Sequence, residues 1–187
     1  NSSNRCYFCK INTYDDLIAY TQQIGFEQIV DGTNADDVGD HRPGRQAARE
    51  HDIRSPLQET GLSKAEIREL ARELALPNWD KPAAACLSSR IPYGTLITIE
   101  TLGQVEQAEA ALRQLGFQEL RVRHHDQVAR IEVPPTEFPK AIEESLSIVE
   151  AIKATGYHYV ALDLAGFRSG SMNEVLNGEG LGTGEGN

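Results

Sequence analysis

Residues 119–133, E-L-R-V-R-H-H-D-Q-V-A-R-I-E-V, decide the fold of the C-terminal half of this chain. Apolar and polar residues alternate over 119–124 and again over 128–133, which is the period of a β-strand. The residues H-D-Q between the two runs predict a turn, so we expect a β-hairpin. The alternation also predicts that Arg121 and Arg123 share one face, with Glu132 on the paired strand as a partner for one of them.

The elements around the hairpin complete a small domain. Apolar residues at helical spacing predict a helix over 101–115 that ends at Gly116, and a second helix over 137–154. The run Y-H-Y-V-A-L-D-L at 157–164 predicts a strand. The order helix, strand, strand, helix, strand indicates a small α+β domain.

Three segments are expected along the chain. The Pro- and Gly-bearing residues 92–94 mark a boundary, so we place the small α+β domain at 95–175. Residues 1–94 alternate strand, polar loop and helix, which predicts an α/β domain with a parallel sheet. Loops at the carboxyl ends of such strands bind ligands. The glycine-rich residues 176–187 are predicted to be a disordered tail.

The N-terminal segment has its own local signals. A helix is predicted over 10–24, and E-Q-I-V-D-G at 27–32 predicts a short buried strand. A polar loop rich in glycine and aspartate follows. The next helix is predicted to start at Ser63, because Glu66 three residues later forms a capping box with it.

Composition and charge narrow the class of protein. The chain has 187 residues with 40% hydrophobic and 25% charged content, which is ordinary for a globular protein. No stretch approaches the roughly 18 apolar residues of a membrane helix. The net charge of −10 argues against a nucleic-acid surface, which needs a basic face. Three cysteines, an odd and small number, favour a reducing cytoplasm over a disulfide scaffold.

The three cysteines lie in two motifs. Cys6 and Cys9 are spaced Cys-x-x-Cys in N-R-C-Y-F-C-K, and Cys86 lies in K-P-A-A-A-C-L-S-S-R-I-P-Y-G. Three converging thiolates can hold an iron–sulfur cluster with one iron open to chemistry, or zinc with a fourth ligand. Alternatively, the two motifs are unrelated and Cys86 is a small apolar residue. Spacing alone leaves these alternatives open.

Taken together, six blocks of sequence resemble one known family. In chain order they are N-R-C-Y-F-C-K, D-G-T-N-A-D-D-x-x-D-x-R-P-G, K-P-A-A-A-C-L-S-S-R-I-P-Y-G, R-V-R-H, A-R-I-E-V-P and D-L-A-G-F-R-S-G. This series is similar to the LarE family, ATP-dependent sulfur transferases of the PP-loop superfamily, over about residues 1–175. The resemblance implies that residues 1–94 are the C-terminal part of a Rossmann-like PP-loop domain.

The resemblance also implies an activity. Such enzymes adenylate a carboxylate of a pyridinium mononucleotide and then insert sulfur to form a thiocarboxylate, a precursor of the nickel-pincer nucleotide of lactate racemase. Members with three cysteines hold a [4Fe-4S] cluster whose fourth iron binds the sulfide to be transferred. The implied cofactors are this cluster on Cys6, Cys9 and Cys86, with ATP and Mg²⁺. We expect a homo-oligomer.

One departure from the family is clear. The phosphate-binding loop of PP-loop enzymes, S-G-G-x-D-S, is missing from these residues. We therefore expect the chain to be a fragment that cannot complete adenylation alone. Two other interpretations stay open: another PP-loop enzyme such as a tRNA thiolase, and a non-catalytic zinc-binding remnant.

The candidate binding residues are mainly arginines. The resemblance favours an anion pocket formed by Ser89, Arg90, Arg121, Arg123 and Arg168 and braced by Glu132, because arginine forks suit phosphate and carboxylate. Surface salt bridges are the alternative. In the N-terminal loop the candidates for nucleotide or Mg²⁺ are Asn34, Asp36, Asp37 and Asp40, and the alternative there is plain turn chemistry. His124 and His125 are predicted to be solvated, and Trp79 to be in the core.

Overall fold

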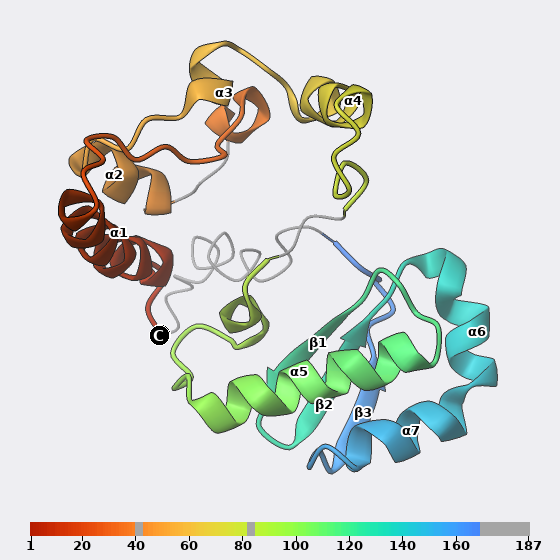
Figure 1. Cartoon of the computed structure of the whole chain (residues 1–187). Coiled ribbons are helices and arrows are strands. Elements are labelled where there is room, and N and C mark those ends of the chain that lie inside the picture. Colours follow the sequence, from red (N-terminus) through yellow and green to blue (C-terminus); the bar gives the residue numbers. More distant parts are fainter. Residues whose placement is uncertain (40–42, 82–84, 169–187) are drawn as a thin grey trace, which may run out of the picture. The chain divides into compact units, whose positions relative to one another are not determined.

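A computed structural model describes residues 1–39, 43–81 and 85–168 (Figure 1). Its contacts divide the chain into two compact units between Ala84 and Ala85, with Asn1 belonging to the second. The division lies before residue 94, where the sequence predicts a boundary, because the segment after Ala85 packs with the second unit. The predicted tail at 176–187 lies outside the described residues. No helix among the described residues is long and apolar enough to cross a membrane.

The second unit contains a three-stranded mixed sheet in the order β1-β2-β3. β1 and β2 form the predicted antiparallel hairpin. In its backbone register, Arg121 lies opposite Glu132 and Arg123 lies opposite Arg130. β3 lies parallel to β2, reached through two short helices that replace the single helix predicted over 137–154. Its elements are η2 (Leu87–Arg90), α5 (Ile99–Gln114), β1 (Arg121–His125), β2 (Val128–Glu132), η3 (Pro135–Glu137), α6 (Phe138–Glu143), α7 (Ser145–Lys153) and β3 (Tyr159–Leu162).

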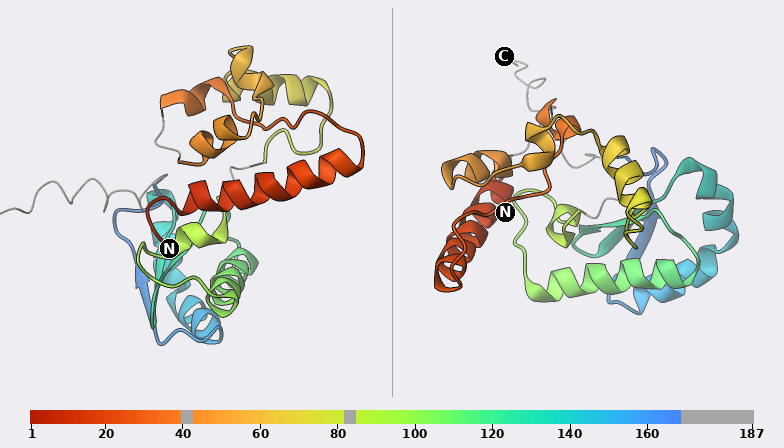
Figure 2. Two further views of the ribbon diagram at one scale, coloured as in Figure 1. Left: turned by 90° about the vertical axis from the view of Figure 1, so that its left-hand side faces the viewer. Right: turned by 45° about the horizontal axis from the view of Figure 1, so that its top comes forward.

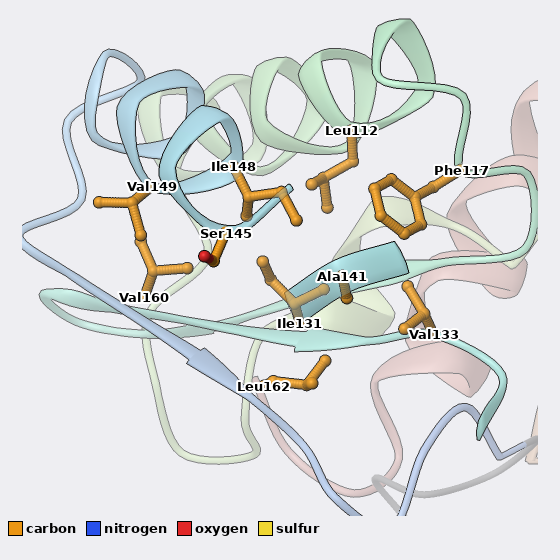
Figure 3. A pocket seen from close by; sticks show the side chains of 10 residues that line it. All are labelled: Leu112, Phe117, Ile131, Val133, Ala141, Ser145, Ile148, Val149, Val160 and Leu162. Carbon is orange, nitrogen blue, oxygen red and sulfur yellow. The ribbon is translucent and has the colours of Figure 1, made fainter. Parts of the chain in front are cut away.

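The core of the second unit lies between the helices and one face of the sheet (Figure 1). Leu112 of α5 is fully buried, as are Val122 of β1 and Ile152 of α7. Figure 3 shows a small apolar pocket in this core, where Ser145 contributes the polar atom among aliphatic and aromatic side chains. Because side chains alternate along a strand, the arginines of the hairpin lie on the opposite face of the sheet.

The first unit is mainly helical. It contains α1 (Arg5–Gln23), η1 (Ala35–Gly39), α2 (Pro43–Glu50), α3 (Pro56–Glu59) and α4 (Lys64–Glu73). Figure 2 shows the chain turning back after α1, and α2 packs against this helix. Their contact buries Tyr14, Ala47, Ala48 and Ile53. The predicted capping box is present, because Ser63 accepts from the Glu66 amide and Glu66 accepts from the Ser63 amide.

The strand predicted at 27–32 is wrong. Val30 makes only an isolated parallel bridge with Arg54, and 58% of its surface is exposed. Within the described part of the first unit, this bridge is the nearest approach to the expected parallel sheet. A single extended segment cannot bury its apolar side chains without paired neighbours, so the local sequence signal is not sufficient to make a strand here.

Candidate functional site

The sheet face opposite the helices of the second unit is rich in charge. By the register of the hairpin, Arg121, Arg123, Arg130 and Glu132 all lie on it. Arg130 was not singled out from the sequence, although its alternation with Glu132 in V-A-R-I-E-V was a usable signal. Arg130 pairs with Glu132 at 3.3 Å and with Asp163, just after β3.

Arg123 and Glu132 form a buried ion pair on this face. Arg123 Nη2 donates to Glu132 Oε2 at 2.7 Å, and the Glu132 side chain is fully buried. Arg123 Nη1 also donates to the carbonyl oxygen of Ser89 at 2.9 Å. The pairing expected across the hairpin is therefore made by Arg123, and it ties β1 to the turn after Cys86.

Arg121 lies at the more open end of the same face. Its guanidinium is half-buried, donates to the Leu120 carbonyl and lies 5.0 Å from the centre of the Phe167 ring. Partial burial lowers the pKa of Arg121, and the positive charges of Arg90 and Arg123 lower it further. Positive charge is thus concentrated around Arg121, which favours an anion beside it.

The turn that carries Cys86 is anchored by Arg90. Cys86 is the residue before η2, and its side chain is exposed. Arg90 is only 3% exposed and forms two parallel hydrogen bonds with Glu109 of α5, at 2.7 and 3.0 Å. Its Nη1 donates to the Ala85 and Cys86 carbonyls and to Ser89 Oγ. Arg90, expected to bind substrate, is therefore placed inside the protein.

Glu109 is a second residue that the sequence analysis missed. It is 1% exposed and accepts hydrogen bonds from Arg90, Arg113 and the Val122 amide. Burial would raise the pKa of Glu109, but the hydrogen bonds and charge of Arg90 hold that pKa below its ordinary value. A glutamate within the apolar stripe of the 101–115 helix was the signal that pointed to a buried partner.

The segment after β3 returns to the charged face. The Phe167 amide donates to the Val133 carbonyl at 2.9 Å, which sets the Phe167 ring beneath Arg121. Gly166 has a positive φ of 75°, and a Cβ there would meet Pro135 at 3.0 Å, so glycine suits this turn. Arg168 Nη1 donates to the Gly166 carbonyl at 3.1 Å. The predicted Arg168 thus follows directly on the ring that stacks with Arg121.

The acidic loop of the first unit uses its side chains locally. Asn34 Oδ1 accepts from the Asp36 amide at 3.0 Å, and Asp37 Oδ2 accepts from the Asn34 amide at 3.1 Å. Asp36 Oδ2 accepts from the Lys64 amide at the start of α4, at 2.8 Å. These are turn and helix-capping contacts. Asp40 lies outside the described residues, and the nucleotide or Mg²⁺ role of this loop stays a prediction.

The three cysteines are divided between the two units. Cys6 and Cys9 are separated by one turn of α1, Cys86 belongs to the second unit, and all three are exposed free thiols. Exposed thiols outside disulfides suit the soft donor set that iron–sulfur clusters require. Within either unit, the described residues contain no group of three His, Cys, Asp or Glu side chains that could hold a metal. The shared cluster stays a prediction.

Comparison with known proteins places the chain among relatives. No protein-family model matches it. Over 183 residues it is 40% identical to the pyridinium-3,5-bisthiocarboxylic acid mononucleotide synthase of Lactiplantibacillus plantarum, a match that covers 98% of this chain and 66% of that protein. The chain is a homologue of this synthase.

Two further relatives are uncharacterised proteins. One, from Synechocystis sp., is 47% identical over 178 residues, which cover 94% of this chain. The other, from Methanocaldococcus jannaschii, is 33% identical over 169 residues, which cover 90%. In both cases the match spans 66% of the relative. The synthase homologue described here therefore corresponds to about two thirds of the length of each relative.

Two positions in this synthase homologue differ from the sequence predictions. His124 is buried, and its Nδ1 lies 3.1 Å from the Tyr157 hydroxyl, because its strand position faces the core with Val122. Burial lowers the pKa of His124 and raises that of Tyr157 to about 12. Trp79, expected in the core, is 41% exposed. Residue type alone did not reveal which face each side chain takes.

The two kinds of surface in the second unit of the synthase homologue suit different chemistry. The pocket of Figure 3 is lined almost entirely by carbon, so it offers nothing to stabilise a charged ligand. Among the described residues, those on and around the opposite sheet face include five arginines (Arg90, Arg113, Arg121, Arg123, Arg130) and three carboxylates (Glu109, Glu132, Asp163). This excess of positive charge, in a chain with net charge −10, is what an anionic ligand needs.

Proposed function

We propose that this chain is the larger part of an ATP-dependent sulfur transferase. Its substrate is a pyridinium mononucleotide, one carboxylate of which is adenylated and then converted to a thiocarboxylate. The product serves the synthesis of the nickel-pincer nucleotide cofactor. The proposal is supported by the name of the synthase to which the chain is 40% identical and by the resemblance of its motifs to the LarE family.

The observation that carries the proposal is the set of residues around Arg121. Arg121 lies near Arg90 and Arg123, and Arg90 in turn holds the carbonyl of Cys86. A concentration of positive charge and a cysteine thus occur within one small unit of an acidic protein. Sulfur transfer to an anionic substrate needs both, because the sulfur must meet a carboxylate whose nucleotide phosphate is held in place.

The chemistry requires two steps. Carboxylate oxygen first attacks the α-phosphorus of ATP, which forms an acyl adenylate and releases pyrophosphate. Sulfide then attacks the acyl carbon and AMP leaves with the oxygen, so the product carries one C–S bond in place of a C–O bond. Arg121 is assigned to hold the substrate phosphate, while Asn34, Asp37 and Asp40 are proposed contacts of ATP and Mg²⁺.

Cys6, Cys9 and Cys86 are proposed to hold a [4Fe-4S] cluster together. When bound, such a cluster supplies an iron without a protein ligand, on which sulfide can be carried. The contribution of the chain is to present three accessible thiols as ligands. Each is exposed and free of disulfide bonds, as this role requires.

The test uses the natural protein that contains this chain, purified without oxygen. It is incubated with ATP, Mg²⁺, sulfide and the pyridinium dicarboxylate mononucleotide, and products are followed by mass spectrometry and by pyrophosphate release. We expect pyrophosphate together with a product in which sulfur replaces one oxygen. Cys86→Ser is expected to keep pyrophosphate release and lose the thiocarboxylate. Thiolation of added tRNA instead, or stoichiometric zinc without turnover, would refute the proposal.

A further inference from the structure

The first turn of α2 contains Pro43 and Gly44, which end the second sequence block in R-P-G and have no role in the proposed function. Proline suits the first turn of a helix, because it has no N–H group to donate and its φ is already helical. Gly44 does not have a positive φ, so its backbone conformation is open to any residue. The reason for a glycine here must lie in its surroundings.

Those surroundings are the start of α1, against which α2 packs (Figure 1). A Cβ on Gly44 would lie 3.1 Å from Lys10 Cγ and 3.5 Å from the carbonyl oxygen of Cys6. The first distance is shorter than an ordinary contact between carbon atoms, which is about 3.5–4.0 Å. Gly44 therefore lets α2 approach the cysteine turn, residues 6–9 of α1, more closely than a residue with a side chain would.

The next residue of α2 holds the acidic loop. Arg45 Nη1 donates to the carbonyl oxygens of Asp37 and Val38, at 3.0 and 2.9 Å. Both carbonyl groups belong to η1. One guanidinium nitrogen thus bridges two successive peptide groups, and its positive charge strengthens both hydrogen bonds.

The two contacts belong to one rigid piece of structure. Successive residues of a helix point about 100° apart, so a single turn can present Gly44 to α1 and Arg45 to η1. Two alanines of α2 are buried in its contact with α1. Farther along α2, Glu50 Oε2 accepts from the hydroxyl of Tyr7 in the cysteine turn, at 2.7 Å. A shift of α2 must therefore disturb the cysteine turn and the acidic loop together.

We propose that Gly44 and Arg45 are positioning residues, and that the α2 joint they form holds the cysteine turn at a fixed separation from the acidic loop. This inference rests on the proposed function, in which the loop contacts ATP and the cysteine turn supplies two ligands of the sulfur-carrying site. Sulfide must reach an acyl carbon that is still joined to AMP. A misplacement of about 1 Å lowers the rate of such a transfer about a hundredfold, so a fixed separation has a direct benefit.

The first measurement is amide hydrogen exchange in the natural protein without metal or nucleotide. The amides of Tyr7 and Phe8 report on the cysteine turn, and the amide of Asp37 reports on the acidic loop, because each donates to a backbone carbonyl there. Gly44→Val should speed exchange at all three about tenfold or more. Gly103→Ala in α5 is the matched control, since a Cβ there meets no atom within 4 Å, and it should leave them within about twofold of the parent.

Arg45 has a control on the same helix. Arg45→Ala removes both hydrogen bonds to η1, so the Asp37 amide should exchange about tenfold faster or more. Arg49→Ala, at an exposed position of α2, should leave that amide within about twofold of the parent. Equal exchange in the two variants would show that Arg45 does not hold the loop, which overturns its part in the joint.

A second substitution shows whether the close approach at Gly44 is responsible. Lys10→Ala removes the Cγ atom that a side chain at residue 44 would meet first. Gly44→Ala should speed exchange in the cysteine turn about threefold or more in the parent, but less than about twofold in Lys10→Ala.

Three results of these exchange measurements overturn the inference. They are equal effects of Gly44→Ala in the two backgrounds, unchanged exchange in Gly44→Val, and a change in Gly44→Val that is confined to α1. Thermal unfolding shows whether each variant is folded. If Gly44→Val does not fold, Gly44→Ala with and without Lys10→Ala decides.

The second measurement is the amount of thiocarboxylate formed per pyrophosphate released by the protein with its metal. Gly44→Ala should lower this ratio about tenfold at unchanged iron content, because water hydrolyses the adenylate before sulfide reaches it. A variant that is merely less stable loses both products together and keeps the ratio. A ratio equal to that of the parent overturns the positioning role. A parent that forms no thiocarboxylate refutes the proposed function, whereas the exchange measurements still decide whether the α2 joint exists.

Discussion

The two units of this molecule build their interiors in different ways. In the second unit, helices cover one face of a sheet, and twelve of its described residues form one buried apolar cluster. In the described part of the first unit, the cluster that α1 and α2 enclose contains four buried apolar residues. Both segments contain amphipathic helices, so helix-forming sequence alone does not make a core. A paired sheet gives those helices a continuous apolar surface to cover.

The two units also differ in how deeply their ion pairs are buried. Ion pairs of the first unit, such as Arg54 with Glu59, lie at the surface. The second unit buries Arg90 with Glu109 and Arg123 with Glu132. Surface pairs contribute little and leave side chains mobile, whereas a buried pair fixes its partners because neither can be left alone. In this way the second unit holds the turn after Cys86 against its own rigid elements.

We expect the largest effect from removing a cysteine of either unit. If both changes release the metal, the two units contribute to one site and are not chemically independent. Cys6→Ser and Cys86→Ser should each abolish most of the iron bound by the natural protein purified without oxygen, because each thiolate supplies one ligand. Iron content and the broad visible absorbance of the cluster report the result. If the iron content of Cys86→Ser equals that of the parent, Cys86 is not a ligand and the three-cysteine site is wrong.

Removal of a buried carboxylate should have the next largest effect. Glu109→Ala leaves Arg90 buried without its partner and is expected to cost about 3–5 kcal/mol of unfolding free energy. Glu106→Ala, an exposed glutamate on the same helix, should change it by less than about 0.5 kcal/mol. Urea denaturation of both variants gives the comparison. Similar values for the two would mean that the Arg90–Glu109 pair is not buried in solution.

A matched pair of leucines tests the difference between the cores. Leu112→Ala in α5 opens a cavity at a fully buried position and should cost about 2–5 kcal/mol. Leu74→Ala, at a position 72% exposed after α4, should cost less than about 1 kcal/mol. Hydrogen exchange of each unit shows which part is destabilised. A loss at Leu74 equal to that at Leu112 would indicate that another part of the natural protein covers the first unit.

Removal of Arg121, the proposed contact of the substrate phosphate, should have a smaller effect, which is a loss of mononucleotide affinity. Arg121→Ala should weaken binding of the mononucleotide by about 1.5–3 kcal/mol, or roughly ten- to a hundredfold, because one charged contact to phosphate is lost. Isothermal titration of variants that retain their cluster measures this. Arg72→Ala, an exposed arginine of the first unit, is the control. Affinity within twofold of the parent for both variants would place the anion site elsewhere.

The smallest effect concerns pH and has opposite signs in the two units. The pKa of His124 is lowered by burial, so its contribution to stability is complete above pH 6.5 and is lost as the pH falls below that value. The pKa of His51 is raised by the Ala47 carbonyl and by Asp15, so its contribution is present below pH 6.5 and is lost as the pH rises.

Urea denaturation at about pH 5.5 and pH 7.5 measures this dependence. His124→Gln should reduce the loss of stability on the acid side, and His51→Gln should reduce the loss on the basic side. The same change of slope in both variants would contradict the assignment of His124 to the core.

Much of the second unit could be predicted from the sequence because its signals are local. The alternation in 119–133 gave both strands of the hairpin, and the apolar spacing in 101–115 gave α5 with an error of two residues at its start and one at its end. The capping box at Ser63 was also visible directly. By contrast, the apolar run at 27–32 predicted a strand that has no paired neighbour among the described residues.

Only part of the candidate site could be predicted from the sequence. The motifs singled out Arg90, Arg121, Arg123 and Glu132 as candidates, but not Glu109 or Arg130. The pairing of Arg90 with Glu109 joins residues nineteen positions apart on different elements, and the apolar stripe around Glu109 indicates a buried carboxylate but not which residue pairs with it. How deeply each arginine is buried depends on the packing of distant elements, which the local sequence does not show.

The sequence by itself therefore determined the hairpin and the α5 helix of the second unit, the shared face of its arginines and the resemblance to a family of sulfur transferases. These depend on the period of each element and on short motifs, which act over a few residues. The tertiary structure alone decided that Arg90 and Arg123 are enclosed and that Arg121 is only half-buried. The physical reason is that ion pairs and burial arise between elements distant in the chain, so their energies appear only once the core has closed.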